Sequence, residues 1–314
     1  MNIQRVDHDN SDHAKWVLVD WTIGTICNFS CSYCPPSLHD GKHGFPPPAR
    51  IAEFARVLTC HYRRLNRSVF VQFTGGEVSL YSQLPDVLKD LKDNGIRCGL
   101  ISNGSRGLAF WEKLWPSLDS VVLTHHIEYA KPDSFRAIAE LLSGQIRTHV
   151  QITMLPDRFE ECIERAHAIR AACPQATIGL KPLRAGFGSE LYSYTPEQLA
   201  ILRKPPLSPA RNPIPGGVRG SMRITDGDAM ETLSASRILA HGFNRWQGWS
   251  CSAGLEILAV NPNGDVYRGL CREGGCLGNV NSTVALPVEN IVCGRPTCNC
   301  LADIMTTKVR PARA

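Results

Sequence analysis

The sequence predicts an α/β protein whose larger part is an open, partial (β/α)6 barrel of the TIM type. Two observations predict it. Apolar, partly β-branched runs alternate with segments of helical spacing from Trp16 to Arg184, and polar or reactive residues follow the apolar runs. Strands that alternate with helices of this length need right-handed crossovers and therefore form a parallel sheet. Six repeats are too few for a closed eightfold barrel.

Each element has its own signal in the sequence. Predicted strands span residues 16–26, 69–73, 98–101, 121–124, 150–154 and 177–180. Predicted helices span residues 51–65, 84–92, 108–115, 134–142 and 159–171. Gly95 and Pro174 follow two of these helices, where residues that stop a helix are expected. In parallel α/β folds the chemistry sits at the carboxyl ends of the strands, so a site is expected in the residues that follow them.

A Pro/Gly-rich segment divides the chain. Residues 204–220 contain five prolines and three glycines, a composition that disfavours regular structure. We predict a core domain at residues 1–203, a linker at 204–220 and a small, cysteine-rich domain at 221–314. In that last domain, residues 255–260 and 265–270 flank Asn261-Pro262-Asn263-Gly264, which predicts a β-hairpin.

Composition narrows the class of protein. The 314 residues are 43% apolar and 20% charged, which excludes a disordered chain, a collagen-like repeat and a disulfide-stapled miniprotein. The formal charge of +5 falls short of a strong nucleic-acid footprint but allows an anionic substrate. No stretch approaches the roughly 20 apolar residues of a membrane span, and the polar N-terminus has no signal-peptide core. We expect a cytoplasmic protein, in the host cytoplasm if it is phage-encoded, with no membrane partner.

The thirteen cysteines point to metal. An odd number suits a complete disulfide set poorly, and clustered thiols in a reducing cytosol more often hold metal. Three lie within eight residues near the N-terminus, and six lie in the C-terminal fifth of the chain. The scattered ones are expected to be small buried hydrophobic residues: Cys60, Cys98, Cys162 and Cys173.

The N-terminal group, Cys27, Cys31 and Cys34, follows the first predicted strand. Three thiolates can hold three irons of a cubane cluster, which leaves the fourth iron without a protein ligand and open to a reactant. A closed zinc site would need a fourth ligand. His39 or His43 would have to supply it, and this zinc site is the less favoured alternative.

This loop resembles the signature of the radical S-adenosylmethionine (SAM) superfamily, including aromatic Tyr33 before the last cysteine. A second marker is independent, because Thr74-Gly75-Gly76-Glu77 closes the next predicted strand, where the family's Gly-Gly-Glu segment contacts the methionine amino group of SAM. The two glycines would let the backbone approach the ligand, and Glu77 would offer a carboxylate to an ammonium. Ser102 and Asn103 resemble the family's ribose-binding position, with an ordinary Asn-Gly turn as the alternative.

Further candidates follow the later strands. Lys181 and Arg184 are predicted to reach the SAM carboxylate or an anionic substrate, with solvated rim charges as the alternative. His125, His126 and Glu128 are candidate catalytic residues that would face the barrel cavity. Only one of the two histidines is expected to do so, because neighbours on an extended segment point in opposite directions. A structural histidine at a strand end is the competing interpretation.

The C-terminal region resembles the SPASM/twitch extensions of this superfamily, which hold further iron–sulfur clusters. Cys251, the hairpin with Gly264, and Cys271 match the family's arrangement, and a hairpin can bring its flanking cysteines together. Cys298 and Cys300 would complete the set, and the weaker candidates are Cys293 and then Cys276. Six cysteines are too few for two four-cysteine clusters, so one auxiliary cluster is expected, with a structural zinc knuckle as the alternative.

The resemblance implies a chemistry more firmly than a substrate. It implies a SAM-binding 4Fe-4S cluster, a probable second iron–sulfur cluster, and an electron donor such as flavodoxin or ferredoxin. Reductive cleavage of SAM would give methionine and a 5'-deoxyadenosyl radical, which removes hydrogen from the substrate. We expect a small-molecule or nucleotide-type substrate that is amino-acid-bearing or nucleoside-like, with isomerisation favoured over dehydrogenation or epimerisation.

Three other hypotheses stay open. The chain can belong to the peptide-modifying SPASM/twitch branch, although only 26 residues precede Cys27. It can be a non-enzymatic iron–sulfur electron carrier or sensor, which would not need the segment from Thr74 to Glu77. Finally, residues 34–41 and 125–128 resemble phage radical SAM isomerases of DNA thymine hypermodification. The basic residues at 61–67 would then touch DNA phosphates or, more simply, complement a helix dipole.

Overall fold

The computed structural model describes residues 3–188, 190–204, 217–227 and 229–311. Packing divides the chain into two compact units. The barrel unit comprises Thr22–Pro48 and Gln72–Gly217. The terminal unit comprises Met1–Trp21, Ala49–Val71 and Val218–Ala314, so it joins both chain ends. The two units are described separately.

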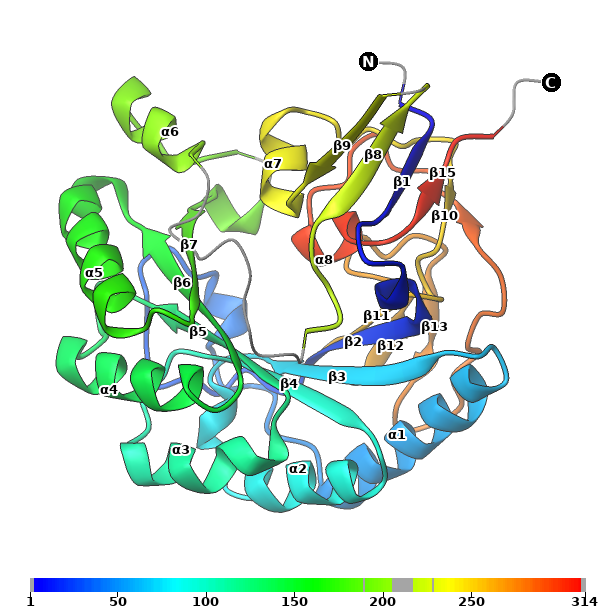
Figure 1. The fold of residues 1–314 in the computed structure, drawn as a ribbon. Coiled ribbons are helices and arrows are strands. Elements are labelled where there is room, and N and C mark those ends of the chain that lie inside the picture. Colours follow the sequence, from blue (N-terminus) through cyan, green and yellow to red (C-terminus); the bar gives the residue numbers. More distant parts are fainter. Residues whose placement is uncertain (1–2, 189, 205–216, 228, 312–314) are drawn as a thin grey trace. The chain divides into compact units, whose positions relative to one another are not determined.

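The barrel unit is built on parallel strands in the order β3-β4-β5-β6-β7, each neighbour hydrogen-bonded to the next. The strands are β3 (Ser68–Thr74), which enters this unit at Gln72, β4 (Arg97–Ser102), β5 (Ser120–His125), β6 (Arg147–Met154) and β7 (Thr177–Pro182). The helices are α2 (Leu84–Asp93), α3 (Leu108–Leu114), α4 (Pro132–Ser143), α5 (Phe159–Ala172) and α6 (Pro196–Leu202). Figure 1 shows α2 to α5 along the outer side of these strands.

Local sequence explains these elements. In α4 the buried side chains of Phe135, Ile138, Ala139 and Leu142 recur three and four residues apart, which forms one apolar stripe. The parallel register sets Leu123 of β5 beside Val150 of β6, and both side chains are fully buried. Apolar strands covered by such helices form the core of this unit.

The predicted fold class is confirmed. Every predicted strand and helix from residue 51 to residue 180 corresponds to an observed one, with ends that differ by a few residues. The first strand, β2 (Trp16–Thr22), ends four residues earlier than predicted. Beyond it, the backbone of Ile23, Gly24 and Ile26 bonds to the chain that follows β3, at Thr74, Gly76 and Glu77. The predicted strand end is thus a loop held by backbone hydrogen bonds.

The terminal unit contains two sheets. One has the order β13-β12-β11-β2-β3, and the other has the order β14-β10-β15-β1-β8-β9. The remaining strands are β1 (Arg5–His8), β8 (Met222–Asp226), β9 (Ala229–Leu233), β10 (Ser250–Cys251), β11 (Ile257–Val260), β12 (Asp265–Tyr267), β13 (Cys276–Asn279), β14 (Ile291–Val292) and β15 (Lys308–Val309). The helices are α1 (Pro48–Arg63), α7 (Ala235–Ala240) and α8 (Leu301–Ile304).

The predicted C-terminal hairpin is confirmed. Strands β11 and β12 pair antiparallel, with Ala259 opposite Tyr267 and Val260 opposite Val266. Strand β11 also pairs in parallel with β2, so the hairpin extends the sheet of this unit. The sheet around β1 has no counterpart in the sequence analysis, because its strands are short and come from distant parts of the chain.

The packing units do not follow the predicted domain order. The sequence places a boundary in residues 204–220, but β1 and α1 pack with the C-terminal region rather than with the barrel. Residues 205–216 of the predicted linker lie outside the described residues. Within the described part of the chain, no helix combines the length and the apolar character needed to cross a membrane.

Candidate functional site

The three N-terminal cysteines lie in the barrel unit, on the loop that follows β2. Cys31 is buried, whereas Cys27 and Cys34 are half-buried. A turn closes the end of this loop, because the Cys34 amide donates to the Cys31 carbonyl over 3.0 Å. The Phe29 amide points at the Cys27 sulfur, 3.4 Å away. These bonds fix the direction of the thiols on one short loop.

The thiols are close enough to affect one another's ionisation. The pKa of Cys31 is raised to about 12, mainly by burial, with smaller contributions from the neighbouring Glu128, Cys34 and Cys27 and an opposing one from the Tyr33 hydroxyl. Burial also raises the pKa of Cys34, and Cys27 adds to the effect. Three neighbouring thiols, one buried and two half-buried, would repel one another as thiolates, so a bound cation would favour their ionisation and release their protons.

The donor set suits a cluster better than a single ion. Among the described residues, no three His, Cys, Asp or Glu side chains converge closely enough to hold one metal ion. His39, a candidate zinc ligand, faces the Cys34 carbonyl through Nε2 at 3.3 Å. A mononuclear zinc site needs its ligands around one point, whereas a cubane cluster bonds each thiolate to a different iron. Spread thiols on one loop therefore fit a four-iron cluster with an open iron.

Residues that follow β5 hold this cysteine loop from one side. The Glu128 carboxylate accepts hydrogen bonds from the Ser32 amide at 2.9 Å and from the Ser32 hydroxyl at 2.6 Å. The Tyr129 hydroxyl donates to the Ser30 carbonyl at 2.9 Å, and its ring stacks on Phe29 at 5.2 Å. The predicted catalytic carboxylate of Glu128 is thus bonded to the loop.

The two neighbouring histidines face different surroundings. His126 lies against the cysteine loop, with Nδ1 2.7 Å from the Tyr33 hydroxyl and 3.5 Å from the Cys31 sulfur. Burial, Lys181 and His125 lower the pKa of His126 to about 3, so its ring is neutral. His125 packs edge-on against Phe135 of α4 at 4.9 Å. The expectation that the pair points in opposite directions is met, and the histidine beside the thiols is His126.

The glycine pair after β3 has a packing role that the sequence analysis missed. Gly75 has φ +148°, and a Cβ there would lie 2.6 Å from the Gly24 carbonyl oxygen. A Cβ on Gly76 would collide with the Ile26 carbonyl oxygen. Thr74 belongs to the same contact, since its carbonyl accepts from the Ile23 amide at 2.9 Å. The glycines are therefore needed for close approach to the backbone before the cysteine loop, which is a different reason from ligand approach.

Glu77 is buried and accepts several hydrogen bonds. Its Oε1 accepts from the Ser79 amide at 2.9 Å and from the Ser102 hydroxyl at 2.7 Å, and its Oε2 accepts from the Asn103 amide at 2.7 Å. A carboxylate offers about four acceptor positions, so these donors leave one on Oε2. Glu77 joins the ends of β3 and β4 and keeps one position for a further donor such as an ammonium.

Ser102 and Asn103 link the end of β4 to its surroundings. Besides its bond to Glu77, the Ser102 oxygen accepts from the Gly104 amide at 3.1 Å. The Asn103 side chain donates to Asn28 Oδ1 of the cysteine loop at 3.1 Å. Its own Oδ1 accepts from the Ser105 amide at 3.0 Å, which fixes the backbone around Gly104.

Lys181 lies on the side of the site formed by β7. Burial lowers the pKa of Lys181, as does the nearby charge of Arg184, whereas the Cys34 thiol opposes them. Lys181 in turn lowers the pKa of Cys34. The β7 end therefore brings a positive charge to the third cysteine of the loop, with Arg184 close to it.

The C-terminal cysteines lie in the terminal unit. Cys251 of β10 and Cys293, which follows the paired strand β14, are buried in one apolar cluster. Burial, Asp303, Cys251 and Cys293 raise the pKa of Cys271 to about 12. Burial also raises the pKa of Cys298, and Cys271 and Cys251 add to it. These four thiols are electrostatic neighbours: Cys251, Cys271, Cys293 and Cys298.

Two other cysteines of this region differ in position. Cys276 is exposed and donates to the nearby Gly278 carbonyl at 3.3 Å. Cys300 is half-buried and occupies the residue before α8. The structure therefore adds Cys293, which the sequence ranked below Cys300, to the group of neighbouring thiols. Of the scattered cysteines, Cys60 is exposed, contrary to expectation, while the other three are buried as predicted.

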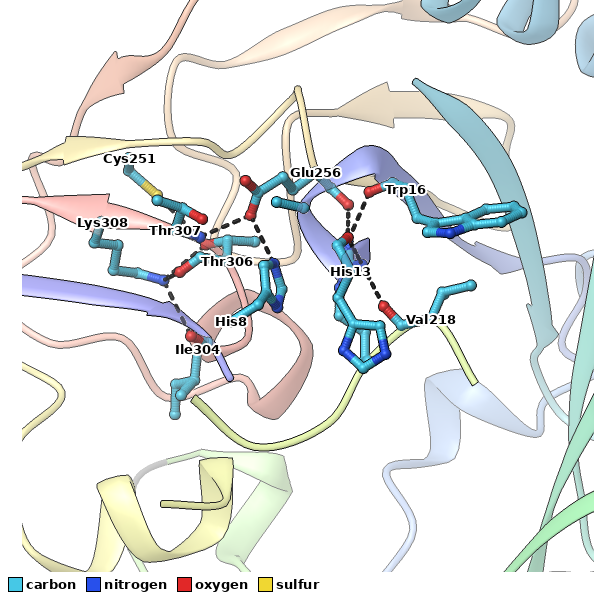
Figure 2. A network of polar contacts seen from close by, with 12 residues as sticks. His8, His13, Trp16, Val218, Cys251, Glu256, Ile304, Thr306, Thr307 and Lys308 are labelled. Carbon is cyan, nitrogen blue, oxygen red and sulfur yellow. Dashed lines mark hydrogen bonds and ion pairs between the residues drawn. The ribbon is translucent and has the colours of Figure 1, made fainter. Parts of the chain in front are cut away.

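A buried polar network lies beside Cys251 of this thiol group, with the Thr306 hydroxyl 3.7 Å from the Cys251 sulfur (Figure 2). The Lys308 ammonium, which is 1% exposed, donates to the Asp303, Ile304 and Thr306 carbonyls and to the Thr306 hydroxyl. The Asp303 carboxylate accepts from the Leu270 amide at 3.0 Å and the Cys271 amide at 2.6 Å. This chain-end segment thereby fixes the backbone that carries Cys271.

The same network includes a buried contact between a histidine and a carboxylate. His8 Nε2 lies 3.0 Å from Glu256 Oε2, and the Thr307 amide donates to that oxygen at 2.7 Å. Of the basic residues considered for DNA phosphates, Arg67 donates to the Ala14 carbonyl and lies 4.0 Å from Glu256. Sequence reasoning missed the network, because a buried charge gives no periodic signal.

One protein-family model and several solved structures are similar to this chain. The sequence model of the Radical SAM superfamily matches residues 21–179, just over half of the chain. The chain therefore belongs to the radical SAM superfamily. No curated protein sequence matches it significantly.

Solved structures resemble the chain over most of its length. SuiB of Streptococcus suis bound to S-adenosylmethionine matches with a TM-score of 0.50 and 14% identity, over 86% of this chain and 63% of SuiB. A second SuiB structure matches with a TM-score of 0.50 and 14% identity, over 87% of this chain and 64% of SuiB. A third, bound to the precursor peptide SuiA, has a TM-score of 0.48 at 13% identity, with coverage of 87% and 64%. The chain thus spans less than two thirds of SuiB, and this likeness is one of fold.

Proposed function

We propose that this chain, a radical SAM enzyme, binds its catalytic 4Fe-4S cluster through Cys27, Cys31 and Cys34 and cleaves SAM beside it. One observation carries the proposal. The three thiols sit on one loop whose residues are bonded to the ends of neighbouring parallel strands. A loop held in this way can present three cluster ligands and leave the fourth iron to SAM.

The iron–sulfur cluster and the residues of the protein have separate tasks in this proposal. Held by Cys27, Cys31 and Cys34, a reduced four-iron cluster would supply the one electron needed to cleave SAM into methionine and a 5'-deoxyadenosyl radical. The chain holds the loop, supplies the free acceptor position of Glu77 to the SAM ammonium, and sets Lys181 near a carboxylate of SAM or substrate. A flavodoxin or ferredoxin would supply the electron.

The test of the central assignment is the triple change of Cys27, Cys31 and Cys34 to Ala. After anaerobic reconstitution, the variant should lose up to about four iron atoms and all SAM cleavage. It should keep the iron of the C-terminal region. Formation of 5'-deoxyadenosine by the triple variant under reducing conditions would overturn the assignment.

Glu77→Gln tests the ammonium contact. The variant should bind SAM about tenfold or more weakly, because a charge-assisted hydrogen bond is typically worth about 1.5 to 3 kcal/mol. Ser102→Ala is the matched control, since it removes one donor to Glu77 but keeps the charge. Equally weakened SAM binding in both variants would mean that the effect comes from a displaced Glu77 side chain and not from its lost charge.

For the auxiliary cluster, we propose Cys251, Cys271, Cys293 and Cys298 as ligands. Their mutual effects on pKa support this set. Cys293→Ala should therefore lower the iron content by up to about four atoms. Full iron content in Cys293→Ala, together with loss of iron in Cys300→Ala, would instead support the set favoured by the sequence, in which Cys300 is a ligand. Stoichiometric zinc in the anaerobically purified protein would indicate a zinc site in place of the cluster.

A peptide is the substrate that the comparisons favour. The fold resembles SuiB over 86% of this chain, and SuiB has been crystallised with its precursor peptide SuiA. A ribosomally made precursor peptide is therefore the first candidate. Deuterium at its reactive carbon should appear in 5'-deoxyadenosine when the peptide is incubated with enzyme, SAM and reductant.

A second candidate is an amino-acid-bearing or nucleoside-type substrate that is isomerised, including modified thymine in DNA. The observation that favours it is the positive charge of Lys181 and Arg184 beside Cys34. Changing both to Ala should then suppress substrate-dependent turnover more than uncoupled SAM cleavage. Deuterium transfer from peptides but not from these substrates would exclude this candidate.

A further inference from the structure

A chain of hydrogen bonds leads from the core of the barrel unit to the Cys31 sulfur. Its members are Thr153 of β6, Tyr33 of the cysteine loop and His126, which follows β5. Thr153 and Tyr33 are 2% and 4% exposed, so water does not compete for their hydroxyl groups. Each hydroxyl group has one proton to donate, so the donor in each of these hydrogen bonds can be deduced from its neighbours.

The direction follows from its inner end. The Thr153 hydroxyl lies 2.8 Å from the His125 carbonyl oxygen, which can only accept, so Thr153 donates there. The Tyr33 hydroxyl lies 3.0 Å from the Thr153 oxygen, whose proton is already used, so Tyr33 donates to Thr153. His126 Nδ1 lies 2.7 Å from the Tyr33 oxygen, whose proton is used in turn. His126 Nδ1 therefore carries a hydrogen.

This N–H also faces the sulfur of Cys31. The Nδ1 to sulfur distance is 3.5 Å, within the range for a hydrogen bond to sulfur. The ring is fixed in this orientation, because it lies parallel to the Tyr33 ring at 5.9 Å and edge-on to Phe29 at 6.1 Å. If Tyr33 donated to His126 Nδ1 instead, this nitrogen would carry no hydrogen, and its lone pair would face the sulfur.

We propose that Thr153 and Tyr33 are positioning residues that fix the Nδ1–H tautomer of His126 and direct its N–H at the Cys31 sulfur. This inference rests on the proposed function, in which Cys31 binds the catalytic cluster. A hydrogen bond to a ligand sulfur withdraws negative charge from it, which favours the reduced, more negative cluster. The hydrogen bonds from Thr153 through Tyr33 to His126 thereby raise the reduction potential of the cluster that must reduce SAM.

The first measurement is a redox titration of the reconstituted protein without SAM, followed by electron paramagnetic resonance. The relevant signal is the one that is absent from the Cys27, Cys31 and Cys34 to Ala variant. If that variant keeps every signal, the proposed function fails, and the outcome is separate from the test below.

Thr153→Val removes the acceptor of the Tyr33 proton, so Tyr33 turns to His126 Nδ1 and the N–H toward Cys31 is lost. The potential should fall, with about a tenfold change in the ratio of oxidised to reduced cluster at a fixed potential, or about 59 mV for one electron. His126→Phe should lower it similarly. Tyr33→Phe should leave it unchanged or raise it, because the N–H then belongs to Cys31 alone. Thr148→Val is the control, since it removes another buried hydroxyl of β6, one that donates to the Ile146 carbonyl and not to Tyr33 or His126, and it should leave the potential unchanged.

Two results would overturn the inference. The first is an unchanged potential in Thr153→Val, and the second is a fall in Tyr33→Phe as large as that in Thr153→Val. The second would mean that the Tyr33 hydroxyl itself donates to Cys31.

A second measurement needs no cluster. Histidine ¹⁵N chemical shifts of the cluster-free protein, assigned with His126→Phe, should show an Nδ1–H tautomer for His126 and an Nε2–H tautomer in Thr153→Val. The same tautomer in both proteins would refute the proposed direction even if a variant binds no iron.

Discussion

His125 provides a test of how a buried, neutral histidine makes stability depend on pH. Its side chain is 1% exposed, and neither ring nitrogen has a hydrogen-bond partner among the described residues. Burial lowers its pKa from 6.5 to about 4, with Arg165 and Arg158 of the α5 region adding to the effect and Glu161 opposing it. The unfolded chain therefore binds a proton at a higher pH than the folded chain does.

The sign and size of the effect follow by linkage. A lowered folded-state pKa contributes stability that is complete above about pH 6.5 and is lost as pH falls toward about 4. For this one group, the free energy of unfolding falls by about 1.3 kcal/mol between about pH 7.5 and about pH 5.5. One unit of pH over which only the unfolded chain is protonated is worth about 1.4 kcal/mol. His125→Phe keeps a ring against Phe135 but cannot take up the proton.

Urea unfolding of the two proteins at these two pH values measures the difference. The wild type should lose about 1.3 kcal/mol more stability than His125→Phe on going to the lower pH. The variant should also be more stable at about pH 7.5, because two unpaired buried nitrogens are removed. Parallel loss of stability in both proteins would refute the argument and would mean that the His125 ring titrates normally.

Other predictions concern backbone contacts and the network of the terminal unit. Gly76→Ala should destabilise the protein by about 2 kcal/mol or more through collision with Ile26, whereas Gly44→Ala, with open space at its Cβ, should change stability by less than about 0.5 kcal/mol in thermal unfolding. Lys308→Met should cost about 3 kcal/mol in urea unfolding, because several buried acceptors lose their donor. For Glu256, burial raises the pKa, but the His8 hydrogen bond and charge and the Thr307 amide outweigh it and lower the pKa overall. Glu256 therefore gives stability that is present above about pH 4.5 and lost below it, and Glu256→Gln should flatten that part of the stability profile.

The sequence predicted the barrel unit well because its signals are local. A helix such as α4 shows its apolar stripe within twelve residues, and a strand such as β6 shows its apolar pattern within eight. The sheet of β1, β8, β10 and β15 depends on pairing between residues that are hundreds of positions apart, as in Val6 opposite Lys308. A two-residue strand is too short to show a periodic pattern, so the sequence does not predict which strand it pairs with.

In the candidate site, the motifs located the residues but not what those residues contact. Gly75 and Gly76 stood out in the sequence, yet only the structure shows that their neighbours are carbonyl oxygens of the preceding loop. Glu128 is predicted as a catalytic residue from its position after a strand, but only the structure shows that its carboxylate is bonded to Ser32 of the cysteine loop. A hydrogen-bond partner depends on side-chain direction and long-range register, which residue spacing does not encode.

The cysteine loop is held by side chains, not by its own secondary structure. Asn28, Ser32 and Tyr33 bond to residues at or beyond the ends of β4, β5 and β6 respectively, so successive strands each contribute one anchor. Because the parallel strands fix their ends relative to one another, three separate anchors determine the direction of the loop without any metal. If these cysteines bind the cluster as proposed, loading it requires loss of the thiol protons, Cys31 having a pKa of about 12, more than it requires folding of the loop. The direction of the three thiols is therefore set by the same strand ends that bring Glu77 and Lys181 to the site.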